Sequence, residues 1–196
     1  MSTVMRIGYY GKLPLAGDFL RRGLSAEFTT AWDGWMLRTL ERAQQDDGTW
    51  RAAYLSAPIW RFSLAPGLLG PRGAMGIMIP SHDRVGRLFP FCIAAETDLP
   101  PLSAQLALHQ VAALWESVAL HLIAETVSRA TLEAEIDRLP RPVPVLHLGA
   151  APSSAGSIWA TMAQGGARVM QLPQMPTAPW QAAALFDTTT PEHRDI

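Results

Sequence analysis

Apolar residues recur at helical spacing early in the chain. Phe28 and Trp32 fall within one sector of a helix, and charged residues occupy the opposite side. Ser25 can cap this helix by accepting a backbone N–H from its first turn. The pattern predicts an amphipathic helix from residue 26 to about residue 45. Asp33 lies at the edge of the apolar stripe, where its charge needs a partner or solvent.

A longer amphipathic pattern runs from about Ser103 to Arg129. It predicts one helix with His109 and His121 on its water-facing side. A short further helix is predicted at residues 131–138. The apolar face of the long helix comprises Leu108, Val111, Leu114, Trp115, Val118 and Leu122.

Extended segments rich in β-branched and aromatic residues alternate with these helices. Residues 157–162 and 168–172 flank Gly165-Gly166 and predict a hairpin, whereas residues 150–156 read as a flexible loop. Because strands and helices interleave, the pattern predicts an α/β fold. The other predicted extended segments are residues 4–10, 59–64, 76–79, 91–95 and 143–148, and the middle three of these are expected to pair in sequence.

The length of 196 residues suits a single domain spanning residues 1–196, which can bury roughly 70% of the surface that the unfolded chain exposes. We predict a central mixed sheet covered by the helices around Trp35 and Trp115. The side chains expected in that sheet core are Ile7, Trp60, Phe62, Ile77, Ile79, Phe91 and Ile93.

Charge and composition exclude several classes of function. The net charge is −1 and no basic stripe is present, so we expect no nucleic-acid partner. The longest apolar stretch, Val111 to Ala124, is interrupted by Glu116 and His121 and is shorter than the roughly 18 residues of a membrane span. The first ten residues lack a signal-peptide pattern, and Cys92 is the single cysteine. We therefore expect a cytoplasmic protein without membrane insertion.

The sequence contains no recognisable catalytic or metal-binding motif. A phosphate-binding P-loop fails at Gly11-Lys12, where Arg6 replaces the first glycine and Leu13 replaces the hydroxyl residue. The five histidines show no metal-ligand spacing. Ser81-His82-Asp83 brings three triad residue types together, but adjacent side chains of an extended segment point to opposite faces. We expect no catalytic residue, no metal and no cofactor.

Four dense blocks of glycine, proline, aromatic and charged residues remain. They are Gly-Lys-x-Pro-x-x-Gly-Asp-Phe at residues 11–19, Trp-Asp-x-Trp at 32–35, Pro-x-Trp-Arg-Phe at 58–62 and Pro-Ser-x-Asp-Arg-Val-Gly-Arg-x-Phe-Pro at 80–90. In this order and spacing they resemble the TagF family of type VI secretion system-associated proteins, in its N-terminal domain. The resemblance covers about residues 6–95 closely, and residues 100–196 agree mainly in pattern.

This resemblance implies a three-layer α/β/α sandwich and a non-enzymatic cytoplasmic regulator. Such a protein represses a type VI secretion system after translation by binding another protein. The implied partner is a cytoplasmic protein of the secretion system, in some systems the forkhead-associated scaffold. No small-molecule substrate is expected.

The motif residues have two readings. Glycines such as Gly11, Gly17 and Gly86 are expected to allow positive φ or close backbone approach, prolines to fix turns, and aromatic rings to fill the core. The charged residues either pair with one another across the two loops or face outward toward a partner. The residues assigned to this structural network are Gly11, Pro14, Gly17, Asp18, Phe19, Arg22, Trp32, Asp33, Trp35, Trp60, Arg61, Phe62, Pro80, Ser81, Asp83, Gly86, Phe89 and Pro90.

Three basic residues, Lys12, Arg84 and Arg87, are the candidates for contact with the protein partner, because arginine forks suit carboxylate-rich surfaces. The alternative is an anion- or nucleotide-binding module, or an unrecognised enzyme, that uses Arg22, Arg84 and Arg87 against phosphate. We also expect Asp18 to cap a turn or to pair with one of these arginines rather than bind a metal.

Overall fold

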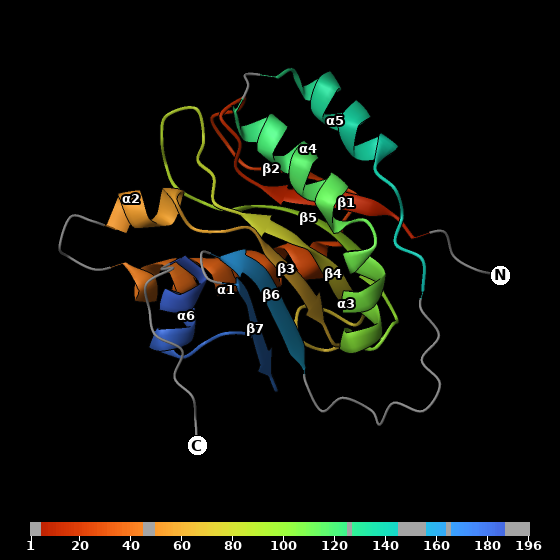
Figure 1. The fold of residues 1–196 in the computed structure, drawn as a ribbon. Helices are drawn as coiled ribbons and strands as arrows, with labels where there is room; N and C mark the ends of the chain where they lie inside the picture. The colour runs from red at the N-terminus through yellow and green to blue at the C-terminus, as the bar shows by residue number, and fades with distance from the viewer. Residues whose placement is uncertain (1–4, 45–49, 125–126, 145–155, 164–165, 187–196) are drawn as a thin grey trace.

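The computed structural model describes residues 5–44, 50–124, 127–144, 156–163 and 166–186, and Figure 1 shows their arrangement. The strands are β1 Ile7–Gly11, β2 Leu20–Arg22, β3 Trp60–Leu64, β4 Gly73–Ile79, β5 Phe91–Thr97, β6 Ser157–Ala163 and β7 Gly166–Leu172. The helices are α1 Ala26–Ala43, α2 Trp50–Leu55, α3 Pro101–His109, α4 Ala112–Ala124, α5 Arg129–Arg138 and α6 Pro179–Phe186.

The described strands form one sheet of seven strands in the order β2-β1-β5-β4-β3-β6-β7. Every neighbouring pair in this sheet runs antiparallel, so the expected mixed sheet is wrong. Strands β3, β4 and β5 pair in sequence, as predicted. They run antiparallel because their short connections do not allow the crossover that parallel neighbours need.

Helices pack on both faces of the sheet (Figure 1). One apolar cluster joins α1, α2 and α6 to the sheet through large rings, including Trp32 and Trp60. The second cluster joins α3, α4 and α5 to the other face through smaller side chains and Trp115. The predicted α/β class is therefore confirmed, whereas the three-layer sandwich stays a prediction.

Aromatic rings dominate the first cluster. Trp32 lies at its centre, with ring centroids of Phe62 at 4.9 Å and Trp35 at 5.1 Å. The indole N–H of Trp35 donates to the Pro176 carbonyl at 2.8 Å, and that of Trp60 donates to a carbonyl of α6 at 2.9 Å. The seven side chains predicted to lie in the sheet core are all buried.

Helix α1 begins and ends close to its predicted bounds. The Ser25 hydroxyl accepts the backbone N–H of Phe28 at 3.2 Å, as the capping pattern predicted. Asp33 at the edge of the stripe accepts a hydrogen bond from the hydroxyl of Tyr10 at 2.8 Å. The Asp33 carboxylate thus has a hydrogen-bond donor on β1 and does not lie unpartnered in an apolar environment.

The single helix predicted from Ser103 to Arg129 is wrong, because the chain bends by 71° between α3 and α4. The bend changes the phase of the apolar face, so Leu114 is 57% exposed while Trp115 is fully buried. No single described helix is long and apolar enough to cross a membrane, and only the bent α3–α4 pair reaches that length and composition.

The strand predictions are largely confirmed, including the hairpin of β6 and β7. Strand β2 and helices α2 and α6 were not anticipated. Strand β2 has three residues, and α2 and α6 have six and eight, which are too short for a periodic signal. Most of the segments predicted at residues 143–148 and 150–156 lies outside the described residues.

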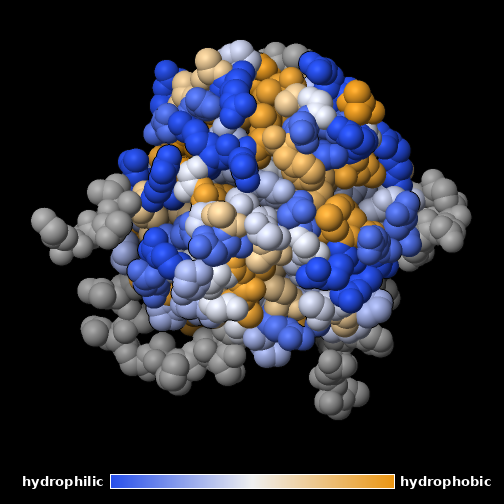
Figure 2. All heavy atoms as spheres, turned by 180° about the vertical axis from the view of Figure 1, so that it is seen from behind, coloured by the Kyte–Doolittle hydropathy of each residue, from blue (hydrophilic) through white to orange (hydrophobic). Residues whose placement is uncertain are grey.

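Exposed apolar side chains are dispersed over several elements. Val85 is 70% exposed and Met162 69% exposed, and they belong to a loop and to β6 respectively. Figure 2 shows the face opposite to that of Figure 1, on which apolar patches are separated by hydrophilic residues. A protein docking on this face would meet polar groups beside each apolar patch.

Candidate functional site

Two of the motif-bearing segments meet at one end of the sheet. One connects β1 to β2 and contains residues 12–19, and the other connects β4 to β5 and contains residues 80–90. The first segment starts from β1 and the second ends at β5, and these two strands pair with each other. The backbone N–H of Arg84 donates to the Ala16 carbonyl at 2.9 Å, and the Arg87 guanidinium donates to the Gly17 carbonyl. The two segments therefore form one connected unit.

The carboxylate of Asp83 lies at the centre of this unit. Its side chain is fully buried and accepts the backbone N–H groups of Val85 at 3.1 Å and Arg87 at 2.9 Å. The Arg87 Nε donates to the second oxygen at 2.6 Å, and the Lys12 ammonium lies 3.2 Å from that oxygen. Four donors from two loops thus converge on one buried charge.

These donors determine the ionisation of Asp83. Burial raises the pKa of a carboxyl group, but here the hydrogen bonds from Arg87 and Lys12 outweigh burial and hold the pKa of Asp83 well below its usual range. Asp83 is consequently ionised at neutral pH and acts as a counter-ion for both cations.

The base of the 80–90 loop is held by further hydrogen bonds. The Tyr54 hydroxyl accepts the backbone N–H of Ser81 at 3.1 Å and donates to the Ser81 carbonyl at 3.0 Å. Arg51 of α2 donates to the Gly86 carbonyl at 3.1 Å. Gly86 itself adopts a φ of +85°, which permits the turn that returns the chain to Arg87. Tyr54 and Arg51 both lie on α2, so this helix fixes the loop.

Five side chains of the unit are exposed: Asp18, Phe19, Arg84, Val85 and Arg87. We call the last four of them the loop edge. Phe19 is 36% exposed, and its other face packs on Phe89 and Tyr10, with centroid distances of 4.8 and 5.5 Å. The Arg87 side chain is 60% exposed although its Nε contacts Asp83. Charged and apolar groups thus lie together on a rigid support.

Lys12, predicted as a partner contact, is buried at 7% exposure between Asp83 and the ring of Phe19. Its ammonium lies within the structural unit rather than on the loop edge, whereas Arg84 and Arg87 are exposed. Val85 had not been singled out from the sequence, because a lone valine between arginines carries no periodic signal.

The other predicted charges lie elsewhere. Asp18 is exposed, and its carboxylate accepts the backbone N–H of Phe19 at 2.8 Å, with no ion pair to an arginine of the described residues. Arg22 pairs with Asp137 of α5 at 2.6 Å, and Arg61 pairs with Glu116 of α4 at 2.6 Å. The network across the two loops is therefore built around Asp83 and does not include Arg22.

The exposed position of Asp18 determines the expected result of its removal. Because the side chain is exposed, replacement by alanine is expected to shift the melting temperature by less than about 2 °C. Thermal unfolding followed by circular dichroism measures this shift. A decrease of several degrees would show that Asp18 supports the fold beyond its hydrogen bond to Phe19.

The Ser81-His82-Asp83 run does not form a catalytic relay. His82 Nδ1 lies 2.9 Å from the backbone carbonyl of Asp83, and the Asp83 carboxylate faces Lys12 and Arg87 instead. The Ser81 hydroxyl is buried without a hydrogen-bond partner among the described residues. Within those residues there is also no group of three or more histidine, cysteine or acidic side chains arranged to hold a metal ion.

Comparison with known proteins places this unit in a family. A family profile described as "TagF N-terminal domain, Type VI secretion system-associated" matches residues 8–139, which is more than half of the chain. The chain belongs to the TagF family. The match includes both loop segments and extends beyond the region around residues 6–95 in which the sequence blocks resemble the family.

A solved structure has the TagF chain's fold over nearly its whole length. The crystal structure of PA0076 from Pseudomonas aeruginosa PAO1, at 2.05 Å resolution, is similar with a TM-score of 0.78 and 30% sequence identity. The alignment covers 92% of this chain and 94% of that one. No curated protein matches the TagF chain.

Proposed function

We propose that this TagF-family chain is a non-enzymatic regulator of a bacterial type VI secretion system. It acts in the cytoplasm as a post-translational repressor and does so by binding another protein. Membership of a family associated with type VI secretion supports the biological context. The absence of a relay in the Ser81-His82-Asp83 run agrees with a binding role, since the one triad-like motif is occupied by structural contacts.

The loop edge is the observation that carries this proposal. Arg84 and Arg87 present cationic groups beside Phe19 and Val85, and the buried Asp83 fixes the backbone beneath them. Loops on a rigid scaffold are where recognition residues gather, and arginine and aromatic side chains dominate binding energy at interfaces. Such an edge suits a carboxylate-rich surface that also offers apolar contact. The proposed partner is a cytoplasmic protein of the secretion apparatus, in some systems the forkhead-associated scaffold.

The alternative of an anion- or nucleotide-binding module at these loops finds less support. It requires Arg22, Arg84 and Arg87 to converge, but Arg22 is bound to Asp137 of α5 and Arg87 to Asp83. The arginines thus belong to separate networks. Any effect of a nucleotide on thermal unfolding is therefore expected to be the same in the wild type and in Arg84→Ala.

Capture of the partner by variants of the loop edge tests the proposal. Arg84→Ala removes an exposed guanidinium whose side chain has no hydrogen bond within the described residues, so folding should be preserved. Binding to the purified secretion-system protein is expected to weaken by about 10- to 30-fold, the range of a central interface arginine. Arg38→Ala, which removes an exposed arginine from α1, is the matched control and should bind normally.

Arg87→Ala is a second variant that tests partner binding by the loop edge. It removes both an exposed group and a hydrogen bond to Asp83, so we expect weaker binding together with a lower melting temperature. If Arg84→Ala and Arg87→Ala both bind as well as Arg38→Ala, the loop edge is not the binding surface. Equal loss in all three variants would equally exclude a specific role for the edge.

A further inference from the structure

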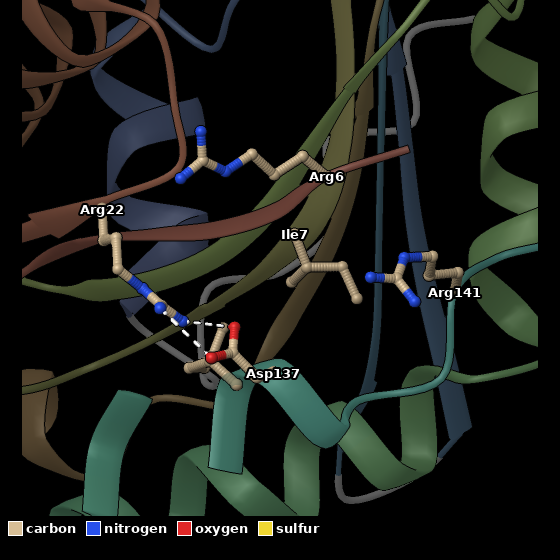
Figure 3. A pocket seen from close by; sticks show the side chains of 6 residues that line it. Arg6, Ile7, Arg22, Asp137 and Arg141 are labelled. Carbon is tan, nitrogen blue, oxygen red and sulfur yellow. Dashed lines mark hydrogen bonds and ion pairs between the residues drawn. The ribbon is translucent and has the colours of Figure 1, made fainter. Parts of the chain in front are cut away.

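A second basic site lies away from the loop edge, in a cavity of about 170 Å³ beside β1. Its walls come from the start of β1, from β2, from the end of α5 and from the segment after α5 (Figure 3). The lining residues are Arg6, Ile7, Arg22, Ile136, Asp137 and Arg141. Three arginines and one aspartate are among the lining residues, so these four residues carry an excess of two positive charges.

Arg22 is held in place by several contacts. Its two Nη atoms donate to the two oxygens of Asp137 at 2.6 and 3.2 Å, and Nη2 also donates to the Glu133 carbonyl at 3.2 Å. The guanidinium lies 5.9 Å from the centroid of the Tyr9 ring. The Glu133 carboxylate pairs with Arg129 at 3.2 Å. Arg22 is thus pre-positioned at one wall.

The other two arginines approach from different segments. Arg141 donates through Nε to the Met5 carbonyl at 3.1 Å, which fixes the segment after α5 against the residue before Arg6. Figure 3 shows the Arg141 guanidinium directed toward Ile7, and the Arg6 guanidinium on the same side of Ile7 as Arg22 but apart from the Arg22–Asp137 pair. Arg6 is exposed and forms no ion pair with a described residue. Among the described residues, neither Arg6 nor Arg141 therefore has an ion pair with an acid.

We propose that this cavity binds a phosphate group. A phosphate monoester carries nearly two negative charges at neutral pH, which matches the excess of two arginines, and guanidinium forks bind its oxygens in bidentate fashion. The cavity is smaller than the roughly 300–1,000 Å³ of sites for drug-sized ligands, so it admits the phosphate group and not a whole nucleotide.

Asp137 has a defined part in this proposal. Its carboxylate is 66% exposed and occupies the Arg22 fork in the absence of an anion. The hydrogen bond from Arg22 lowers the pKa of Asp137, so the group is ionised at neutral pH and competes with an incoming phosphate. Removing this charge should therefore tighten anion binding, an effect that a purely structural ion pair would not produce.

Isothermal titration calorimetry of the full chain with inorganic phosphate at constant ionic strength tests the proposal. We expect one saturable site in the wild type, at least tenfold weaker binding in Arg6→Gln/Arg141→Gln, and at least threefold tighter binding in Asp137→Asn. Arg38→Gln, which removes an exposed arginine of α1, is the control for net charge and should bind as the wild type does. Circular dichroism establishes that each variant is folded.

Phosphoserine, titrated in parallel, distinguishes the source of the group. Binding of phosphoserine as tight as that of inorganic phosphate indicates a phosphate carried by a larger molecule, and preference for inorganic phosphate indicates the free anion. Either result supports the site. The proposal is overturned if the wild type shows no saturable binding, if the double arginine variant binds equally well, or if Asp137→Asn does not bind more tightly. None of these outcomes bears on partner capture by the loop edge.

Discussion

Replacement of Asp83 by alanine is expected to lower the melting temperature by at least about 5 °C and to abolish partner capture. The substitution removes the acceptor of three hydrogen bonds and leaves the ammonium of Lys12, a residue that is 7% exposed, without its counter-ion. The 80–90 loop then loses the group that holds Val85 and Arg87 in position. Thermal unfolding and the binding assay on the same protein measure both effects.

Asp18→Ala is the matched control, because Asp18 lies in the neighbouring loop but is exposed. The double variant Lys12→Met/Asp83→Leu adds a second test, since it removes the buried charges together and should be less destabilised than Asp83→Ala. A melting temperature of Asp83→Ala equal to that of Asp18→Ala would contradict the structural role assigned to the buried carboxylate.

The same group predicts how stability depends on pH. The folded-state pKa of Asp83 lies below the value of about 3.9 for an unfolded aspartate, so its contribution is complete above that pH. The contribution is lost as the pH falls through the range between the unfolded and folded values. Between pH 5 and pH 3 the wild type is therefore expected to lose more thermal stability than Asp83→Asn. Parallel decreases in the two proteins would place the acid sensitivity elsewhere.

Replacement of Gly11 by alanine is the second change with a large expected effect. Gly11 has a φ of +133°, and a Cβ at this position would lie 2.1 Å from the Pro90 carbonyl oxygen. The clash is with backbone of the neighbouring segment, which cannot move without separating β1 from β5. We expect a loss of about 3 kcal/mol or more in the free energy of unfolding, measured by urea denaturation.

Gly34→Ala provides a control of opposite sign. Gly34 lies within α1, and a Cβ there would meet only the end of the Arg38 side chain at 3.4 Å. Alanine is favoured over glycine inside a helix by about 0.5–1 kcal/mol, so this variant should be more stable than the wild type. The account of Gly11 fails if Gly11→Ala unfolds at the same urea concentration as the wild type.

The parts of the fold that could be predicted from the sequence are those with strong local periodicity. Helix α1 has a wide apolar stripe and a serine cap, and β6 and β7 flank two glycines. The local sequence of each element is therefore enough to predict it. The bend between α3 and α4 could not be predicted, because both helices are apolar enough for their patterns to merge at Gln110. The order and direction of the strands depend on pairings between distant segments, which the sequence of a single segment does not indicate.

The candidate site was predictable in composition but not in its pairings. The sequence blocks identified Asp83 and Arg87, which lie four residues apart and pair with each other. The burial of Lys12 depends on its ion pair with Asp83, which lies in a loop after another strand. The position of Lys12 in the sequence therefore does not indicate that it is buried. Arg22 likewise finds Asp137 across 115 residues. The exposed neighbours Arg84 and Val85 could be separated from the buried ones only by the folded geometry.

Site-specific photo-crosslinking tests the central claim, that the loop edge contacts a protein of the secretion apparatus, most directly. A photoreactive phenylalanine analogue replaces Val85, which is 70% exposed, and in a control replaces Leu37 of α1, which is 46% exposed. Irradiation in the native host followed by mass spectrometry identifies the captured protein. The account predicts a crosslink from position 85 to one cytoplasmic type VI secretion protein and none from position 37. Capture of that protein from position 37 with none from position 85 would contradict it.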